Sequence, residues 1–392
     1  MQGDCIIVPL GLPQVRVLSQ EDLPGGGLAV RVVLRAEVRS CPTCGRLTGK
    51  VHDRAEQTKG DVSWAGRPVV LVLVKRRFRC PFCGKVFTEP DEVCGWRRRL
   101  TQRLREEIYQ AARGSTVKQV AKSKGLSQDT VRRALAEGAR GELEERQAEP
   151  VRHLALDEFS VRKGQVYQTA FYDLERRWVL SVIEGRTKEG VQAYLESLAA
   201  PEAVEAVSMD MSGVYRSAVC ECLPGAEIVA DKFHVIKRVN EQLDRLRVRL
   251  QAGEGRKGNL YKSRYLLLKN REDLNAVQRQ KLDELFRHYP ELRRAYLLKE
   301  DFRRWYRPQS KIQARLELKA WAAYVEEGGP AEFQELASML TDWREEILNY
   351  FEFGLTNAFA EGKNTRTKQI QRQAYGYRNL DNLNLRILLP CA

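Results

Sequence analysis

The sequence Val151-Arg-His-Leu-Ala-Leu-Asp157 is a short β-type run that ends in an acidic residue. Two further β-type runs follow it closely, at 166–174 and 178–184. Closely spaced runs of this kind predict an antiparallel meander. The chain then continues with a helix at 188–199, a strand at 204–209, a helix at 213–223 and a strand at 226–230. This βββαβαβ order predicts a mixed α/β domain around one central sheet.

Acidic residues follow two of these predicted strands. Asp157 ends the first, and Asp210 follows the fourth. In a sheet of this order the first and fourth strands commonly lie side by side, so we expect the two carboxylates to bind one or two Mg²⁺ or Mn²⁺ ions. The alternative, which the residues alone leave open, is that each Asp is a solvated loop residue or a helix cap.

A third carboxylate is expected from a helix packed near these strand ends. Glu361 is the candidate, because at helical spacing it shares a face with Thr365, Lys368 and Arg372. A metal ligand would then lie beside the basic residues Lys368 and Arg372, which we expect to contact phosphate groups of DNA.

The helical block from 234 to about 348 separates the two aspartates from Glu361. It is dense in charge, and Leu, Tyr and Trp recur in it at helical spacing without a strand signal. We interpret it as an all-helical insertion late in the α/β domain.

Two matched knuckles precede the α/β domain. Cys41-Pro-Thr-Cys44-Gly and Cys80-Pro-Phe-Cys83-Gly each aim two thiolates at one point. Four thiolates in tetrahedral array suit a structural Zn²⁺ ion with no open coordination position. The alternative is two unrelated turns that carry cysteine, although two matched knuckles are unusual by accident.

Residues 116–135 have the pattern of a helix-turn-helix, with a turn at Gly125 and these side chains facing inward: Val117, Val120, Ala121, Val131 and Leu135. Ser127 is expected to cap the second helix. We expect the exposed side chains of that helix to contact base edges and phosphates in a major groove: Gln128, Asp129, Thr130, Arg132 and Arg133. A basic helix is expected just upstream, with Arg97, Arg98, Arg99, Arg103 and Arg105. A plain helical hairpin with a solvated basic face is the alternative.

The net charge of +14 favours a nucleic-acid partner, because it is concentrated in two segments. Residues 97–140 carry 12 Lys and Arg against 4 Asp and Glu, and residues 361–378 carry 5 against 1. No run approaches the ~18 apolar residues of a membrane helix, so we expect no membrane partner. The N-terminus lacks the pattern of a signal peptide, which favours the reducing cytosol.

In these residues the sequence resembles bacterial insertion-sequence transposases of the ISL-three group, which use a DDE triad. The resemblance runs over nearly the whole chain. Its matching segments, in order, are the two cysteine knuckles, Leu156-Asp-Glu-Phe-Ser-Val-Arg-Lys-Gly164, Met209-Asp210, Val229-Ala-Asp-Lys-Phe-His-Val235 and Ala360-Glu-Gly-Lys-Asn364.

The resemblance implies a ribonuclease H-like core with Asp157, Asp210 and Glu361 as ligands of catalytic Mg²⁺. It also implies that Asp231 and His234 belong to a D-x-x-H element. We interpret His234 as a phosphate or active-site contact, and the alternative is that it only caps or packs.

The expected activity is transposition: binding of the terminal inverted repeats, Mg²⁺-dependent DNA cleavage and strand transfer into target DNA. The protein is expected in the bacterial cytoplasm at the nucleoid, and as a homodimer or larger assembly on double-stranded DNA. The rival interpretations are a non-catalytic DNA-binding regulator and a nuclease without strand transfer.

The expected domain organisation has five parts. They are a zinc-binding β module at 1–92, a helix-turn-helix domain at 93–149, the first part of the catalytic core at 150–235, the helical insertion at 236–348 and the final part of the core at 349–392.

Overall fold

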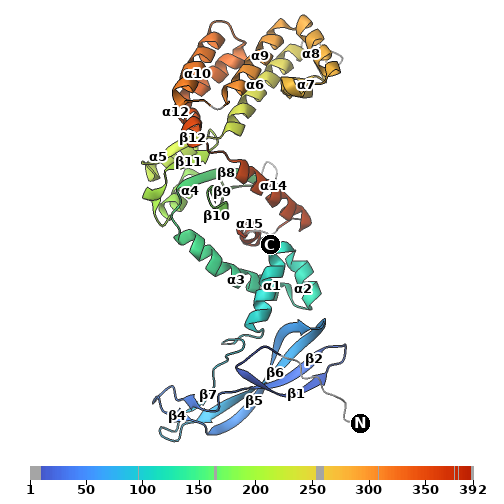
Figure 1. Cartoon of the computed structure of the whole chain (residues 1–392), viewed down its shortest axis with the longest axis vertical. Coiled ribbons are helices and arrows are strands. Elements are labelled where there is room, and N and C mark those ends of the chain that lie inside the picture. The colour runs from blue at the N-terminus through green and yellow to red at the C-terminus, as the bar shows by residue number, and fades with distance from the viewer. Residues whose placement is uncertain are drawn as a thin grey trace. The chain divides into compact units, whose positions relative to one another are not determined.

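The computed structural model describes residues 10–95, 97–162, 166–252, 260–307, 309–374, 376–377 and 379–389 (Figure 1). The described residues divide into two compact units, one ending at residue 142 and the other running from 143 to 389. The division falls inside helix α3 (Gln128–Ala148). The helix ends one residue before Glu149, the last residue of the predicted helix-turn-helix domain, whereas the division between the units falls earlier, after residue 142.

The first unit begins with a twisted β module. Its main sheet has the strand order β1-β2-β6-β5, and β7 pairs with the far end of β6. The strands are β1 (Val15–Asp22), β2 (Leu28–Leu34), β5 (Val51–Trp64), β6 (Arg67–Arg79) and β7 (Val86–Thr88), with a small separate hairpin of β3 (Arg39–Ser40) and β4 (Leu47–Thr48). Alternating residues of β2 and β6, such as Val30, Val32, Leu71 and Leu73, are fully buried and form the module's core.

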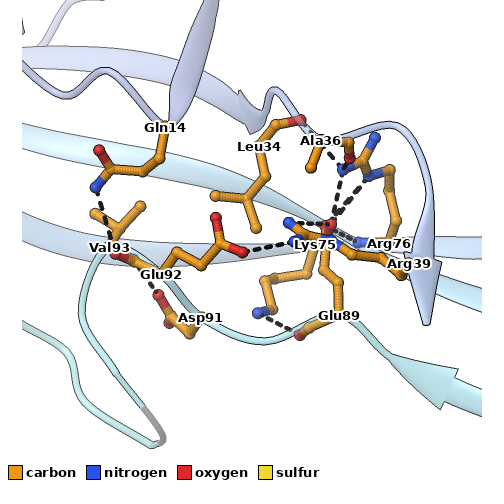
Figure 2. A network of polar contacts seen from close by, with 10 residues as sticks. All are labelled: Gln14, Leu34, Ala36, Arg39, Lys75, Arg76, Glu89, Asp91, Glu92 and Val93. Atoms are coloured by element: carbon orange, nitrogen blue, oxygen red, sulfur yellow. Dashed lines mark hydrogen bonds and ion pairs between the residues drawn. The ribbon is translucent and has the colours of Figure 1, made fainter. Parts of the chain in front are cut away.

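A buried polar network ties the chain after β7 back to this sheet (Figure 2). The Glu89 carboxylate accepts hydrogen bonds from the backbone N–H of Arg76 at 2.8 Å and from its Nη2 at 2.7 Å. The Arg76 guanidinium also donates to the carbonyl oxygens of Leu34 and Ala36, on the chain leaving β2. The buried Glu89 charge is therefore paired and hydrogen-bonded, as burial of a carboxylate requires.

Three helices complete the first unit: α1 (Gln102–Gly114), α2 (Val117–Lys124) and the first part of α3. Thr116 caps α2 by accepting from the backbone N–H of Gln119, and Ser127 accepts from that of Thr130 at the start of α3. Gly125 ends α2 in the left-handed conformation, with φ of 64°. The buried side chains between these helices include Ile108, Ala112, Val120, Val131 and Leu135.

The predicted basic helix is wrong at its N-terminal end, because α1 begins only at Gln102. Arg97, Arg98 and Arg99 precede it in an irregular segment that joins the edge of β5. The backbone N–H of Gly60 donates to the carbonyl of Arg99 at 2.8 Å, and the N–H of Thr101 donates to that of Gly60 at 3.0 Å. Backbone groups that would have extended the helix are thus bonded to a strand.

The second unit is built on a five-stranded sheet with the order β10-β9-β8-β11-β12. Its strands are β8 (His153–Arg162), β9 (Val166–Asp173), β10 (Trp178–Glu184), β11 (Ala206–Met209) and β12 (Glu227–Ala230). β8, β9 and β10 are antiparallel neighbours, whereas β11 runs parallel to both β8 and β12. The predicted meander, the βββαβαβ order and the pairing of the first with the fourth strand are confirmed.

Helices cover both faces of this sheet. The even-numbered residues Leu154 and Leu156 of β8 pack with helices α4 (Lys188–Glu196) and α5 (Gly213–Cys222). The odd-numbered Ala155 and Phe159 pack with α14 (Ala358–Gln373) and α15 (Leu380–Leu388) on the opposite face. Asp157 has the parity of the second set, so its side chain is on the α14 face.

The described residues between β12 and α14 form helices joined by turns and short irregular segments, with no strand among them, as predicted (yellow to red in Figure 1). Its helices are α6 (Lys232–Ala252), α7 (Arg264–Leu268), α8 (Ala276–His288), α9 (Pro290–Trp305), α10 (Lys311–Glu326), α11 (Ala331–Asp342), α12 (Arg344–Leu348) and α13 (Tyr350–Phe353). Their apolar faces join the sheet core in one continuous cluster. A search of the described residues finds no helix with the length and apolar character needed to cross a membrane.

Candidate active site and DNA-binding modules

Three aspartates lie in one row across the parallel strands of the second unit. His153 of β8 pairs with Ala206 of β11, which pairs with Glu227 of β12. Continued by four residues, this register aligns Asp157, Asp210 and Asp231. The last two directly follow Met209 and Ala230, which end their strands. The row therefore brings three carboxylates to the edge of the sheet where β11 and β12 end. β8 itself continues to Arg162 and pairs there with β9, so the prediction that Asp157 ends its strand is wrong.

Asp157 is held by a donor on each of its oxygens. The backbone N–H of Glu158 donates to Oδ1 at 2.8 Å, and Asn364 Nδ2 of α14 donates to Oδ2 at 2.7 Å. The side chain is buried, with 7% of the residue exposed. Burial, reinforced by the negative charges of Asp210, Asp231 and Glu361, raises the pKa of Asp157 to about 7.

Within the described part of the chain, the other three carboxylates each have one buried oxygen without a hydrogen-bond partner: Asp210 Oδ1, Asp231 Oδ2 and Glu361 Oε1. Burial raises the pKa of both Asp210 and Glu361, and the negative charge of Asp231 adds to both shifts. The half-buried imidazole of His234, on the first turn of α6, opposes these shifts. Buried carboxylate oxygens without donors are uncommon in proteins, and a hard cation is the partner that such a set accepts.

Helix α14, which carries Glu361, is fixed to the same sheet edge by Asn357. The backbone N–H of Asn357 donates to Asp231 Oδ1 at 3.0 Å, and its side-chain Nδ2 donates to the carbonyl of Leu156 at 3.1 Å. The carbonyl of Asn357 accepts from the N–H of Glu361 at 2.9 Å, in the first turn of the helix. Glu361 therefore lies one helical turn after Asn357, the residue that bonds both β8 and Asp231.

The carboxylates share this edge without forming a closed ligand set. Among the described residues, only the four cysteines of the first unit form a group of three or more potential ligands whose atoms all lie within 4.8 Å of one another. Asp157, Asp210 and Glu361 would need side-chain rotations to bind one ion together. The backbone positions and the donor-free oxygens fit a cation.

Lys368 and Arg372 are exposed on α14, beyond Glu361 along the helix axis. Thr365, the fourth member of the predicted face, donates its hydroxyl to the carbonyl of Glu361 at 3.1 Å. The two basic side chains are therefore free of the core and available to solvent-borne anions.

Four residues at this site were not predicted from the sequence: Asn357, Asn364, Glu158 and Tyr215. Glu158 lies on the opposite face of β8 from Asp157 and accepts from the hydroxyl of buried Tyr215 at 3.0 Å. The two asparagines stand four residues before and three residues after Glu361, so their helical spacing was the available signal. Neutral amides contribute nothing to the charge pattern that indicated Glu361, so their helical spacing alone did not mark them as site residues.

The four cysteines converge as the two knuckles predict. Cys41 Sγ lies 3.6 Å from Cys83 Sγ, and Cys44 Sγ lies 3.6 Å from Cys80 Sγ. Four thiolates around Zn²⁺ at ~2.3 Å are about 3.8 Å apart, so the cluster has the size of a zinc site. The backbone N–H groups of Cys44 and Thr43 help lower the pKa of the Cys41 thiol to about 6, which favours the thiolate.

The helix-turn-helix geometry is present at the predicted residues. Gln128 and Arg133 are exposed on the first turns of α3, and Thr130 and Arg132 are half-buried there. Arg132 is paired within its helix, to Asp129 at 2.6 Å and to Gln128 at 3.3 Å, whereas Arg133 makes only a long bond to the carbonyl of Asp129. Arg133 is thus the less restrained of the two arginines.

The arginines upstream of the helix-turn-helix divide into two groups. Arg98 is half-exposed and pairs with Glu137 at 3.1 Å. Arg103 is turned inward, where its Nε donates to the fully buried Asp61 carboxylate at 2.7 Å, and Arg105 donates to the carbonyl of Cys94 at 3.1 Å. Two of the five arginines predicted for the basic helix, Arg103 and Arg105, therefore join α1 to the β module.

Three family models match the chain in the order of these modules. A model described as zinc-finger of transposase IS204/IS1001/IS1096/IS1165 matches residues 37–83, and one described as helix-turn-helix domain of transposase family ISL3 matches residues 95–139. The third, described as transposase of the same family, matches residues 154–387, which is more than half of the chain. The chain belongs to the ISL3 family of transposases.

Relatives of this transposase include the transposase for insertion sequence element IS1001 of Bordetella parapertussis. The two are 32% identical over 379 residues, which cover 95% of this chain and 93% of the relative. The transposase for insertion sequence element IS1557 of Mycobacterium tuberculosis is 28% identical over 256 residues, or 58% of this chain and 57% of that protein. The family also supports a structural zinc ion at the four-cysteine cluster and DNA binding by the helix-turn-helix.

Proposed function

We propose that this transposase binds the terminal inverted repeats of its own insertion sequence, cuts the DNA there and joins the freed end to target DNA. The observation that carries the proposal is the row of Asp157, Asp210 and Asp231 with Glu361 held opposite on α14. The strand order β10-β9-β8-β11-β12, with helices on both faces, supports a ribonuclease H-like core.

Asp157, Asp210 and Glu361 are the proposed ligands of catalytic Mg²⁺. Bound there, Mg²⁺ would lower the pKa of an attacking water or 3′-hydroxyl and stabilise the charge that develops on the phosphate. Asp231 holds the start of α14 through Asn357, which fixes the distance of Glu361 from the strand ends. His234, near Asp210 and Glu361, is the proposed contact to the reacting phosphate, and Lys368 and Arg372 are the proposed contacts to flanking phosphates.

Recognition of the DNA ends is assigned to the first unit. Gln128, Thr130, Arg132 and Arg133 are the proposed contacts of α3 to the major groove, with Arg97 and Arg98 as backbone contacts beside it. In the sequence, the helical block lies between the DNA-binding residues of the first unit and Glu361. The other two proposed ligands, Asp157 and Asp210, precede the block. Synapsis of two DNA ends would bring at least two copies of the chain together.

The test is an assay of cleavage and strand transfer on labelled DNA that carries the repeats flanking this reading frame, with Mg²⁺. We expect the wild type to cut at the repeat boundary and Asp157→Asn to bind the same DNA without cutting. Glu205→Gln is the matched control, because it removes an exposed carboxylate from the chain entering the opposite end of β11. Binding without cutting by the wild type would indicate a regulator, and equal cutting of unrelated DNA would indicate a nuclease; either result would overturn the proposal.

A further inference from the structure

The side chain of Asn364 forms a relay between the apolar core and the candidate active site. The hydroxyl of Tyr172 donates to Asn364 Oδ1 at 3.2 Å, and Asn364 Nδ2 donates to Asp157 Oδ2 at 2.7 Å and to the carbonyl of Glu158 at 3.5 Å. Tyr172 is 1% exposed, and its ring stands edge-on to that of Phe359 with 5.9 Å between centroids. The first donor of this relay is therefore fixed by packing.

We propose that Asn364 is a positioning residue for the Asp157 carboxylate. This inference rests on the proposed function, in which Asp157 binds Mg²⁺. A flipped amide would bring its oxygen against Asp157 Oδ2, and two acceptors would then face each other. The carboxylate therefore sets the direction of the amide, and the Tyr172 hydroxyl donates to the amide oxygen on its other side. Asn364 thus always presents N–H to Oδ2, while the N–H of Glu158 fixes Oδ1.

The charge of the side chain matters as much as its direction. An Arg or Lys at position 364 would neutralise Asp157 and compete with a divalent cation. A neutral amide restrains the carboxylate and leaves its negative charge for the metal. Each carboxylate oxygen has two lone pairs, so one donor on each oxygen leaves a lone pair on both for coordination.

Asn357 supports the same function from two turns earlier on α14. Its side chain donates to the carbonyl of Leu156, the residue before Asp157, while Asn364 bonds Asp157 and the carbonyl of Glu158. The two asparagines therefore hydrogen-bond to the backbone of β8 on either side of Asp157. Glu361 lies between them on the helix, so the register that positions Asp157 also positions the third proposed ligand.

The experiment measures binding of Mn²⁺ alone to the purified full-length protein by electron paramagnetic resonance, without DNA. We expect Asn364→Ala and Asn364→Leu to weaken Mn²⁺ binding about tenfold, as loss of a residue that orients a metal ligand commonly does. Tyr172→Phe should weaken it less, since the amide keeps its donor but loses the restraint on its orientation. The half-saturating Mg²⁺ concentration for DNA cleavage should rise in parallel.

Asn349→Ala is the matched control. Asn349 is also buried in this unit, and its Nδ2 donates to the Ile228 carbonyl and to Glu227, both at 2.9 Å, away from the carboxylate row. A merely structural role of Asn364 predicts that both alanine variants lower the melting temperature and that neither changes Mn²⁺ affinity. That result, or recovery of wild-type affinity in Asn364→Leu, would overturn the inference.

The proposed function fails separately from this inference. If Asp157→Asn binds Mn²⁺ and cuts DNA as the wild type does, Asp157 is not a metal ligand and both proposals are overturned. If Asp157→Asn loses both properties while Asn364→Ala keeps wild-type Mn²⁺ affinity, only the positioning role of Asn364 is overturned.

Discussion

Asn357 and Asp231 are 126 positions apart in the sequence, yet the backbone N–H of Asn357 donates to Asp231 Oδ1 over 3.0 Å. Both residues are almost fully buried, with exposures of 0% and 1%. The bond closes the long helical excursion between β12 and α14 and returns the chain to the sheet. Asp231 therefore has a structural role, because its Oδ1 accepts the N–H of Asn357. Its Oδ2 has no hydrogen-bond partner among the described residues.

This structural role predicts different results for two substitutions of Asp231. Asp231→Ala leaves a buried N–H of Asn357 without an acceptor and should destabilise the protein by about 1–3 kcal/mol. Asp231→Asn keeps an acceptor oxygen in place and should unfold close to the wild-type midpoint. The measurement is urea unfolding followed by tryptophan fluorescence. Equal midpoints for the Ala and Asn variants would contradict the structural role.

Removal of one cysteine ligand should release the zinc ion and loosen the β module. We expect about one Zn²⁺ per chain in the wild type and far less in Cys80→Ser, because three thiolates and a hydroxyl bind zinc much more weakly than four thiolates. The measurement is metal analysis by mass spectrometry. Cys220→Ser is the control, since Cys220 is exposed in the second unit and should retain the full zinc content. Loss of zinc from both variants would contradict the ligand assignment.

Arg133 should contribute more to DNA recognition than its paired neighbour Arg132. Arg133→Ala is expected to weaken binding to the terminal repeat about tenfold. Arg132→Ala is expected to weaken it less, because Arg132 is already paired with Asp129 within the helix. Fluorescence anisotropy at several salt concentrations separates the two kinds of contact. Recovery of affinity in Arg133→Lys would indicate a phosphate contact, and continued loss of sequence preference would indicate a base contact. Wild-type affinity in Arg133→Ala would exclude both.

Most of the sheet of the second unit could be predicted from the sequence because its strands are apolar and closely spaced. Leu154 and Leu156 mark β8, and the order of strands and helices then restricts the topology. The first unit was harder to predict. Residues 52–58 of β5 are all exposed, and all of them except Ala55 are polar. They therefore carry no alternation, and backbone pairing with β6 makes them a strand.

The candidate site was predictable in its charges and not in its neutral contacts. Strand ends indicated Asp157 and Asp210, but the alignment of Asp231 with them depends on the register of three parallel strands. Asn364 contacts Asp157 across 207 positions of sequence, and no local pattern reports such a contact. In the same way, Arg103, which the sequence places in a basic helix, is turned inward and donates to the buried Asp61 carboxylate.

The packing of α1 on α3 gives the last prediction, because two glycines of α3 have opposite surroundings. A Cβ at Gly138 would come within 2.5 Å of the ring of Tyr109, whereas a Cβ at Gly141 would meet nothing within 4 Å. Both glycines are helical, so helix propensity alone predicts that alanine stabilises each site by up to ~1 kcal/mol. At Gly138 the clash outweighs this gain, because the Tyr109 ring is buried and its hydroxyl bonds Glu142 at 2.6 Å.

We therefore expect Gly138→Ala to destabilise the first unit by about 1–3 kcal/mol and to weaken DNA binding, since it displaces α3 from α1. Gly141→Ala should raise the melting temperature slightly and leave DNA affinity unchanged. Thermal unfolding and anisotropy on the same preparations test both variants. If Gly138→Ala is as stable as Gly141→Ala, α1 and α3 are not packed through Tyr109, and the helix-turn-helix is held together by the Val120, Val131 and Leu135 contacts alone.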